Sequence, residues 1–330
     1  MSETGEFASR LAEWLAEELG DPGVTIEGLR RTSAGFSREN WVFDATWSAR
    51  GVRQAASLIA RRDPPGSVLV TDRQQEGAVL HAMEHSPVPT PHVRWLDAKG
   101  TRLGRPAVIM DLVEGVCDGF VLNGSRPLER RLDIAQHLYD YLAEIHRFDW
   151  RAHGLDKVLE DPGAGAATAA VEHWERELRA VQLEPEPELE VVLAWLRSHA
   201  PRAQTTTLVH GDFKAGNVLL RDDDVVAILD WETAHLGDPL EDIGWVTNPL
   251  RAGEHRIAGV WEPEDLIRRW SDQTGLQADG RSIEWWRVLA NLKLSVIVLT
   301  GVHAFVDGRL DRCYHSPVRL YQLLLDQIGA

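Results

Sequence analysis

The hydrophobic residues of this chain are spaced mainly as in strands before residue 113 and mainly as in helices after it. In the first part, apolar residues recur every three or four positions at 7–19 and 72–83, which predicts two helices. Short apolar runs predict five strands, at 24–29, 40–47, 55–61, 92–97 and 106–113. A Gly-Asp-Pro-Gly turn at 20–23 ends the first helix. We therefore expect a small sheet with one helix before it and one helix within it.

The second part of the chain has a largely helical pattern. Helices are predicted at 127–148, 189–199, 262–274, 281–305 and 316–329. The Gly/Ala stretch 162–170 is predicted to be a loop that leads into another helix, and short strands are predicted within 208–229. Because strands and helices are segregated along the chain, we predict an α+β fold with an N-lobe at 1–113 and a C-lobe at 114–330.

Composition and charge restrict the partners of the protein. Of its 330 residues 44% are hydrophobic, which suits one large domain or two lobes. The net charge of −16 disfavours nucleic acid and anionic membranes, because these attract basic surfaces. The negative charge either serves solubility or, alternatively, suits a cationic substrate. The longest apolar stretch, 288–305, contains Asn291 and Lys293, so we interpret it as a buried helix and not a membrane span.

The cysteines and the N-terminal residues indicate a cytoplasmic location. Cys117 and Cys313 are too few and too far apart for a disulfide framework or a CxxC site. The first ten residues are polar and acidic, which predicts no signal peptide. We expect a monomer or a homodimer in a reducing compartment.

The predicted strands at 208–229 surround a polar loop whose residues suit phosphoryl transfer. This reaction needs a carboxylate near the acceptor hydroxyl and oxygen ligands that hold Mg²⁺ against the phosphates of ATP. The segment 208-LVHGDFKAGNVLL-220 supplies Asp212 and, five residues later, Asn217, while Asp230 follows the next apolar run. This is the spacing of the catalytic loop of protein kinases. We predict that Asp212 orients or deprotonates the acceptor hydroxyl and that Asn217 and Asp230 bind Mg²⁺.

The same segment resembles the aminoglycoside phosphotransferase family of small-molecule kinases, with HGD and DWE in place of HRD and DFG. The run 209–246, with its LDWE-x-A-H-x-GDP-x-x-D pattern, is most similar to the kinase-like domains fused to some acyl-CoA dehydrogenases. The runs 61–83 and 107–115 resemble the Arg-Arg-x-Pro-Pro-Gly motif and the hinge of that branch. The resemblance covers about residues 25–250. It implies a protein-kinase-like two-lobed fold and an ATP- and Mg²⁺-dependent small-molecule kinase.

The resemblance also implies roles for N-lobe residues. Lysine occurs only at positions 99, 157, 214 and 293, so an arginine must take the place of the phosphate-binding lysine. We favour Arg61, with Arg62 as the alternative, because neighbouring residues of a strand face opposite sides. Glu76 would pair with that arginine. Adenine would bind at Met110, Asp111 and Val113, and Ser33 and Gly35 would belong to the nucleotide loop.

Some residues near the loop have two interpretations. Lys214 is a candidate for stabilising the transferred phosphoryl group, or else an exposed loop residue. His210 is expected to hold the loop, and Asp242 to accept hydrogen bonds from it. The tryptophans Trp174, Trp245, Trp285 and Trp286 would line an acceptor cleft or pack in the core.

The acceptor stays open at this stage. The branch implies a hydroxyacyl-CoA or a hydroxy acid, and the wider family implies an aminoglycoside or another amino-alcohol. The alternative from another class is a catalytically silent nucleotide-binding module. The presence of Asp212, Asn217 and Asp230 together favours the enzyme.

Overall fold

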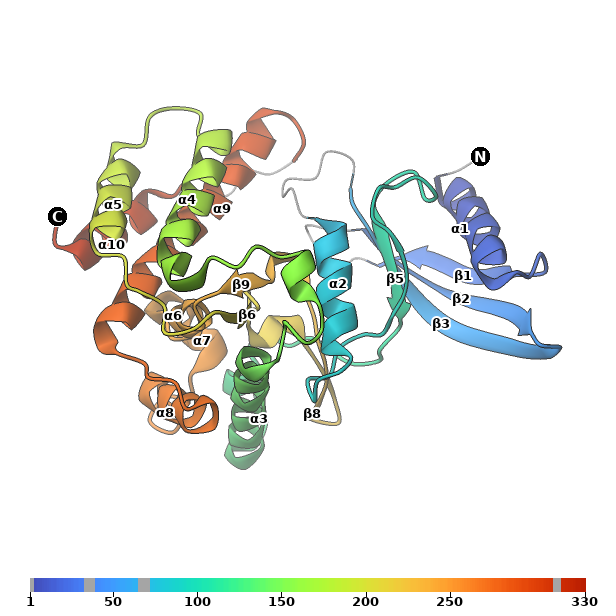
Figure 1. Ribbon diagram of the computed structural model, residues 1–330, viewed down its shortest axis with the longest axis horizontal. Helices are drawn as coiled ribbons and strands as arrows, with labels where there is room; N and C mark the ends of the chain where they lie inside the picture. The colour runs from blue at the N-terminus through green and yellow to red at the C-terminus, as the bar shows by residue number, and fades with distance from the viewer. Residues whose placement is uncertain (1–2, 33–38, 65–71, 311–315) are drawn as a thin grey trace.

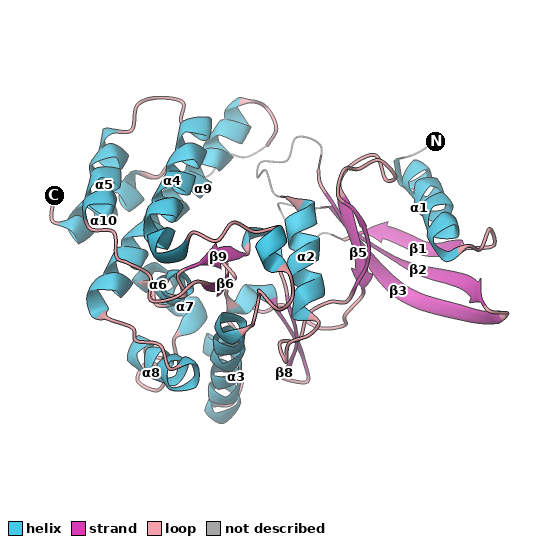
Figure 2. Cartoon of the chain, in the orientation of Figure 1, coloured by secondary structure: helices cyan, strands magenta, loops and turns pink. Residues whose placement is uncertain are grey.

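Strands and helices occupy separate parts of the computed structural model, which describes residues 3–32, 39–64, 72–310 and 316–330 (Figures 1 and 2). Within these residues, the first part forms an antiparallel sheet with the strand order β1-β2-β3-β5-β4. Its strands are β1 (Thr25–Arg31), β2 (Glu39–Ala49), β3 (Val52–Arg62), β4 (Val93–Asp97) and β5 (Ala107–Asp111). Its helices are α1 (Glu3–Leu19) and α2 (Arg73–Met83). All the strands and helices predicted for this part are confirmed, although β5 ends at Asp111 and not at residue 113.

The two faces of the sheet contribute to different hydrophobic clusters. On β5, Ala107 and Ile109 belong to a cluster with the apolar face of α1, whereas Val108 and Met110 belong to the main core together with α2. This division follows from the strand itself, because successive side chains point to opposite faces. Helix α1 therefore covers the outer face of the sheet, and the other face looks toward α2 and the helical part (Figure 1).

The second part of the chain is helical, as predicted. Its helices are α3 (Leu128–Arg147), α4 (Ala166–Val181), α5 (Pro187–Ser198), α6 (Leu240–Val246), α7 (Ala252–His255), α8 (Pro263–Thr274), α9 (Gly280–Val306) and α10 (Val318–Ile328). Helix α4 begins inside the predicted loop 162–170, because alanine has the highest helix propensity of all residues. A helix was expected to begin at Asp238 and Pro239, and α6 confirms it, whereas the short helix α7 was not predicted.

Two small antiparallel sheets lie within the helical part. Strand β6 (Thr207–Val209) pairs with β9 (His235–Gly237), and β7 (Val218–Arg221) pairs with β8 (Asp224–Ile228). β9 was not predicted, since three residues are too short for a periodic pattern. The loop 210–217, which the sequence predicts to be catalytic, connects β6 to β7 and is called the catalytic loop below.

Helix α9 is the long apolar helix expected near the C-terminus. Among the described residues it is the one helix that could cross a membrane by length and composition, but 67% of its most apolar window is buried inside the protein. It packs against α4, α5, α6 and α10. These contacts are those of a core helix, and they bring α9 beside the catalytic loop.

Candidate active site

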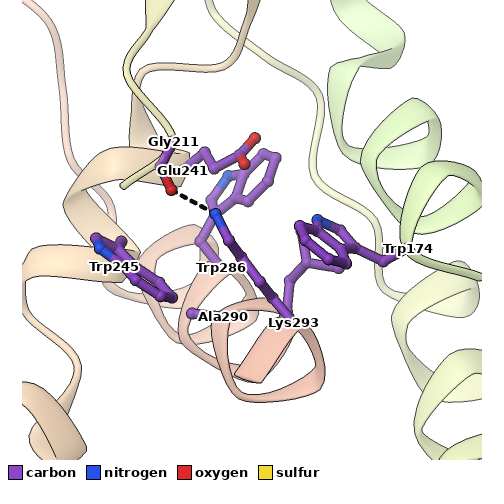
Figure 3. Close-up of a pocket in the computed structure, with 8 residues that line it drawn as sticks. Trp174, Gly211, Glu241, Trp245, Trp286, Ala290 and Lys293 are labelled. Atoms are coloured by element: carbon purple, nitrogen blue, oxygen red, sulfur yellow. Dashed lines mark hydrogen bonds between the residues drawn. The ribbon is translucent and has the colours of Figure 1, made fainter. Parts of the chain in front are cut away.

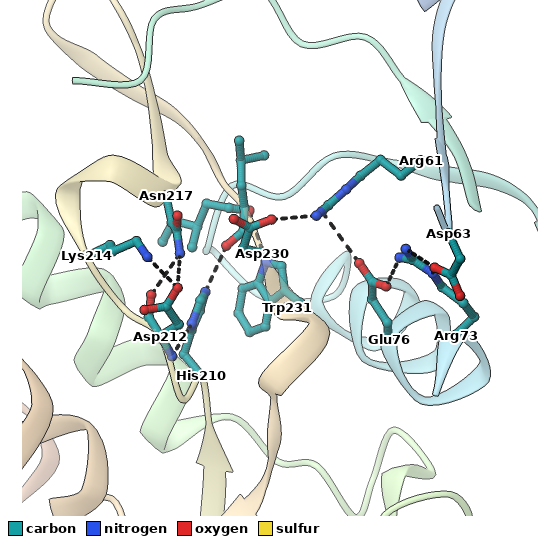
Figure 4. Close-up of polar contacts among 12 residues, drawn as sticks. Arg61, Asp63, Arg73, Glu76, His210, Asp212, Lys214, Asn217, Asp230 and Trp231 are labelled. Carbon is teal, nitrogen blue, oxygen red and sulfur yellow. Dashed lines mark hydrogen bonds and ion pairs between the residues drawn. The ribbon is translucent and has the colours of Figure 1, made fainter. Parts of the chain in front are cut away.

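The catalytic loop brings Asp212, Lys214 and Asn217 together (Figure 4). Residues 215–217 form a 3₁₀ turn that folds the loop back on itself. The Lys214 ammonium lies 2.6 Å from Asp212 Oδ2, and Asn217 Nδ2 donates to the same oxygen at 2.9 Å. Asn217 also donates to the Asp212 carbonyl, so its own amide oxygen is directed away from Asp212. Lys214 is thus partly buried and ion-paired, and it is not an isolated surface lysine.

Two buried side chains hold the backbone of this loop. The Asp212 N–H donates to His210 Nδ1, which leaves the proton on Nε2 to donate to the Leu229 carbonyl at 3.0 Å. Burial lowers the pKa of His210, against the effect of nearby carboxylates, so the ring is neutral. Asp242 accepts from the N–H groups of His210 and Gly211 at 2.8 and 2.9 Å. Both side chains therefore lie where the sequence resemblance placed them.

A buried histidine on α3 extends this support and was not found from the sequence. His146 Nε2 donates to Asp242 Oδ2 at 3.1 Å, and its Nδ1 accepts from the Trp270 indole at 2.8 Å. The contact links helices that are distant in the sequence. The apolar spacing of α3 could have shown that His146 faces the core, but not which residue it meets.

Asp230 lies across from the catalytic loop and contacts the sheet. Its backbone is left-handed, with φ of 61°, at the point where the chain leaves β8. Its Oδ1 lies 2.5 Å from the Arg61 guanidinium, although the two residues are 169 positions apart. Burial opposes the ionisation of Asp230, but Arg61 outweighs it and lowers the pKa of Asp230. Asp230 is therefore an ionised carboxylate that faces both parts of the molecule.

Arg61, and not Arg62, reaches Asp230. Arg61 lies on the sheet face toward α2, where it also forms an ion pair with Glu76 at 3.5 Å. Arg62 points to the α1 face, lies 4.2 Å from the centroid of the Phe7 ring and pairs with Glu39 at 2.8 Å. The alternation along β3 thus gives the two arginines different surroundings.

The other residues predicted to bind the nucleotide lie at the edge of this region or outside the residues that the structure describes. Met110 is buried in the core, and Asp111 is held by Arg94 at 2.7 Å. Val113 follows β5 and is half-buried. Ser33 and Gly35 lie outside the described residues.

The tryptophans near the loop have different environments. Trp174, Trp245 and Trp286 line a small pocket beside Gly211, together with Glu241 and Lys293 (Figure 3). Trp285 donates to the Leu196 carbonyl at 3.0 Å and, like Trp245 and Trp286, belongs to the main hydrophobic core.

Comparison with known proteins assigns the chain to a family. A family model described as the phosphotransferase enzyme family, APH, matches residues 28–286, which is more than half of the chain. The chain belongs to this family. The match continues beyond residue 250, where the sequence resemblance was no longer recognisable, and so includes α8 and the first turns of α9.

Two relatives in this family are parts of longer proteins. Acyl-CoA dehydrogenase family member 10 of Mus musculus is 32% identical over 197 residues, covering 57% of this chain and 18% of that protein. Acyl-CoA dehydrogenase family member 11 of Rattus norvegicus is 29% identical over 265 residues, covering 75% and 34% respectively. The chain thus spans at most about a third of the length of these relatives. The predicted resemblance to the family and to this branch is confirmed.

Solved structures of the family have the same fold. A protein of Ralstonia eutropha assigned to the aminoglycoside phosphotransferases has a TM-score of 0.71 at 19% identity, with 97% of this chain and 95% of that chain covered. A macrolide 2′-phosphotransferase of Brachybacterium faecium has a TM-score of 0.55 at 17% identity, with 97% of each chain covered. At these identities the likeness establishes the fold, so the predicted two-lobed kinase-like fold is confirmed.

The oxygen groups between the two parts of the chain fit a hard divalent cation. The described residues contain no cluster of three or more His, Cys, Asp or Glu side chains that could enclose a metal. Asp230 and the amide oxygen of Asn217 would instead supply two oxygen ligands. Mg²⁺ is commonly held by one or two such groups, with phosphates and water as the remaining ligands.

Proposed function

We propose that this chain is an ATP- and Mg²⁺-dependent kinase that phosphorylates a hydroxyl group of a small molecule. The observation that carries the proposal is that the Asp212–Asn217 contact lies beside the Asp230–Arg61 contact (Figure 4). The Leu229 N–H donates to the Asn217 carbonyl at 2.8 Å and so joins the two segments next to Asp230. Membership of a phosphotransferase family supports the same reaction.

In the proposed reaction, Asp212 accepts the proton of the acceptor hydroxyl. The hydroxyl oxygen forms a bond to the γ-phosphorus of ATP, the bond to the β,γ-bridging oxygen breaks, and ADP leaves with that oxygen. Lys214 lies beside Asp212 and would offset negative charge on the transferred group. The chain contributes mainly position and charge, which is usual for phosphoryl transfer.

The nucleotide would lie between the sheet and the catalytic loop. Arg61, held by Glu76, would bind the α- and β-phosphates, since a guanidinium can donate two parallel hydrogen bonds to phosphate. Adenine would bind at the segment Met110 to Val113, including Asp111. Ser33 and Gly35 remain proposed members of the nucleotide loop.

The proposed metal ligands are Asn217 and Asp230. Bound Mg²⁺ would neutralise charge on the phosphate oxygens. Asp230 is ionised, as a metal ligand must be, because Arg61 lowers its pKa. The Asn217 amide is oriented by its two hydrogen bonds to Asp212. The orientation of the proposed metal ligand is therefore coupled to the position of the proposed base.

The acceptor is a small molecule that carries a hydroxyl group. The relatives named acyl-CoA dehydrogenase family members favour a hydroxyacyl-CoA or a hydroxy acid. The solved structures favour an aminoglycoside or a similar amino-alcohol, since one of them is described as a ternary complex with streptomycin and ATP. Both classes belong in the first test.

The test measures Mg²⁺-dependent ATP consumption with short hydroxyacyl-CoAs, their free acids, aminoglycosides, macrolides, choline and homoserine. We expect Asp212→Asn to lower kcat about 10²- to 10⁴-fold, because a general base is lost, and to leave ATP binding nearly unchanged. Asp222→Asn is the matched control, since Asp222 is exposed in the turn between β7 and β8.

The outcomes separate the enzyme from a silent module. Phosphorylation that is lost in Asp212→Asn and kept in Asp222→Asn supports the kinase. ATP binding without transfer to any acceptor would favour a nucleotide-binding module. Equal turnover in Asp212→Asn and the wild type would refute the role of Asp212.

A further inference from the structure

Lys293 is a buried lysine in α9, the most apolar helix among the described residues. Its side chain on α9 is only 6% exposed. Its Nζ lies 4.6 Å from the Trp245 ring centroid and 5.3 Å from the Trp174 ring centroid (Figure 3). Removing an ammonium group from water costs several kcal/mol unless partners compensate. Aromatic faces compensate only part of this cost, so a lysine at this position suggests a specific task.

The hydrogen bond of Lys293 goes to the backbone of the catalytic loop. Its Nζ donates to the Gly211 carbonyl (Figure 3). That carbonyl belongs to the peptide group that joins Gly211 to Asp212. The N–H of the same peptide donates in turn to His210 Nδ1 at 3.3 Å. Lys293 and His210 therefore hold opposite sides of the peptide that carries the proposed base.

The pocket around Lys293 is too small to be the acceptor site. Its cavity volume is about 10 Å³, which is close to the smallest space that one water molecule needs. Trp174, Trp245 and Trp286 occupy the surrounding space. An acceptor molecule cannot enter this pocket, so Lys293 does not contact the acceptor and would act on the reaction only through neighbouring residues such as Gly211.

We propose that Lys293 is a positioning residue, which fixes the Gly211–Asp212 peptide so that the Asp212 carboxylate faces the acceptor hydroxyl. This inference rests on the proposed function, because it assumes that Asp212 acts on a hydroxyl group. Burial lowers the pKa of Lys293, and the nearby carboxylates of Glu241, Asp212 and Asp242 oppose this shift. A residue on α9 thereby becomes part of the machinery that orients a loop about eighty positions earlier in the chain.

The test compares Lys293→Met with Leu292→Met. Both introduce methionine into the buried side of α9, but Leu292 has no contact with the loop backbone among the hydrogen bonds of the described residues. We expect Lys293→Met to speed amide hydrogen exchange at Gly211 and Asp212 about tenfold, the equivalent of one lost hydrogen bond. With an acceptor that the wild type phosphorylates, kcat should fall about 10- to 100-fold with an unchanged KM for ATP.

A second variant covers the case in which Lys293→Met does not fold. Trp174→Leu removes one wall of the lysine site at a half-buried position, and should speed exchange at the same two amides to a smaller extent. Leu292→Met should leave both exchange and kcat unchanged. A wider loss of protection over α9 and its neighbours would show that Lys293 only stabilises the core, and would overturn the proposal.

The two measurements can refute the inference and the proposed function separately. Hydrogen exchange is measured on the protein alone, so it tests the contact with Gly211 without any substrate. Unchanged exchange at Gly211 and Asp212 in the variants overturns the inference, whatever the activity. A wild type that phosphorylates nothing refutes the proposed function, while faster exchange in Lys293→Met would still support the contact. An unchanged kcat for Lys293→Met in an active protein refutes the positioning role.

Discussion

Asp242 is a fully buried carboxylate whose contribution to stability depends on pH. Burial opposes its ionisation, but the hydrogen bonds that it accepts from the His146 ring and from the His210 backbone N–H outweigh burial and lower its pKa to about 2. The pKa of an aspartate in an unfolded chain is about 3.9. Because the folded state has the lower pKa, ionised Asp242 stabilises the fold above about pH 4, and this stabilisation is lost as the pH falls toward 2.

We therefore expect Asp242→Asn to lower the free energy of unfolding by about 2–3 kcal/mol at neutral pH, given the difference between the two pKa values. The difference between variant and wild type should shrink as the pH is lowered below about 4. Denaturant unfolding followed by tryptophan fluorescence at several pH values measures both quantities. If the variant lost the same free energy of unfolding at every pH, ionisation of Asp242 would not be the source of the stabilisation.

At the scale of the element, the catalytic loop needs a glycine before Asp212. Gly211 has φ of +80°, and a Cβ atom there would lie 2.8 Å from the Thr233 carbonyl oxygen. Gly259 has a similar φ of +73° but has no neighbouring atom within 4 Å of such a Cβ. Alanine at either position strains the backbone by about 1–2 kcal/mol. Of these two positions, only Gly211 would also force the new methyl group against the 3₁₀ turn that contains Thr233.

We expect Gly259→Ala to lower the free energy of unfolding by about 1–2 kcal/mol, and Gly211→Ala by about 1–3 kcal/mol more because of overpacking. Thermal and denaturant unfolding of the two variants give this comparison. If both variants lost the same free energy of unfolding, the loop would be able to move away from Thr233 without an energetic cost.

The elements differ in how far the sequence could predict them. The apolar runs of β1 to β5 and the helices with a clear period were predictable because their patterns depend only on local burial. Asp212, Asn217 and Asp230 could be singled out from the sequence because their spacing is set by one loop and one strand, and their roles stay predictions. His146 and Lys293 were not assigned roles, because their contacts with the catalytic loop arise from the packing of distant helices. The choice between Arg61 and Arg62 needed the strand register, which fixes which face meets α2.

At the scale of the whole molecule, the proposed site is made by both parts of the chain. Arg61 and Glu76 come from the sheet and α2, whereas Asp212, Asn217 and Asp230 come from the helical part. The Arg61–Asp230 ion pair joins the two parts at 2.5 Å. A nucleotide bound between them would contact both, and its binding energy would add to the stability of the arrangement as a whole.

This arrangement leads to an expectation for ligand and metal removal. Mg²⁺ and ATP at about 100 times the dissociation constant should stabilise the folded protein by about 2.7 kcal/mol, which raises Tm. ATP with a chelator should stabilise it less, because Asn217 and Asp230 then lack the ion that joins them to the phosphates. In Asp230→Asn the difference between these two conditions should largely disappear, while Asp222→Asn should keep it. Thermal unfolding of the three proteins under both conditions measures this directly. If the wild type responded equally with and without Mg²⁺, Asp230 would not be a metal ligand, and its pairing with Arg61 would have only a structural role.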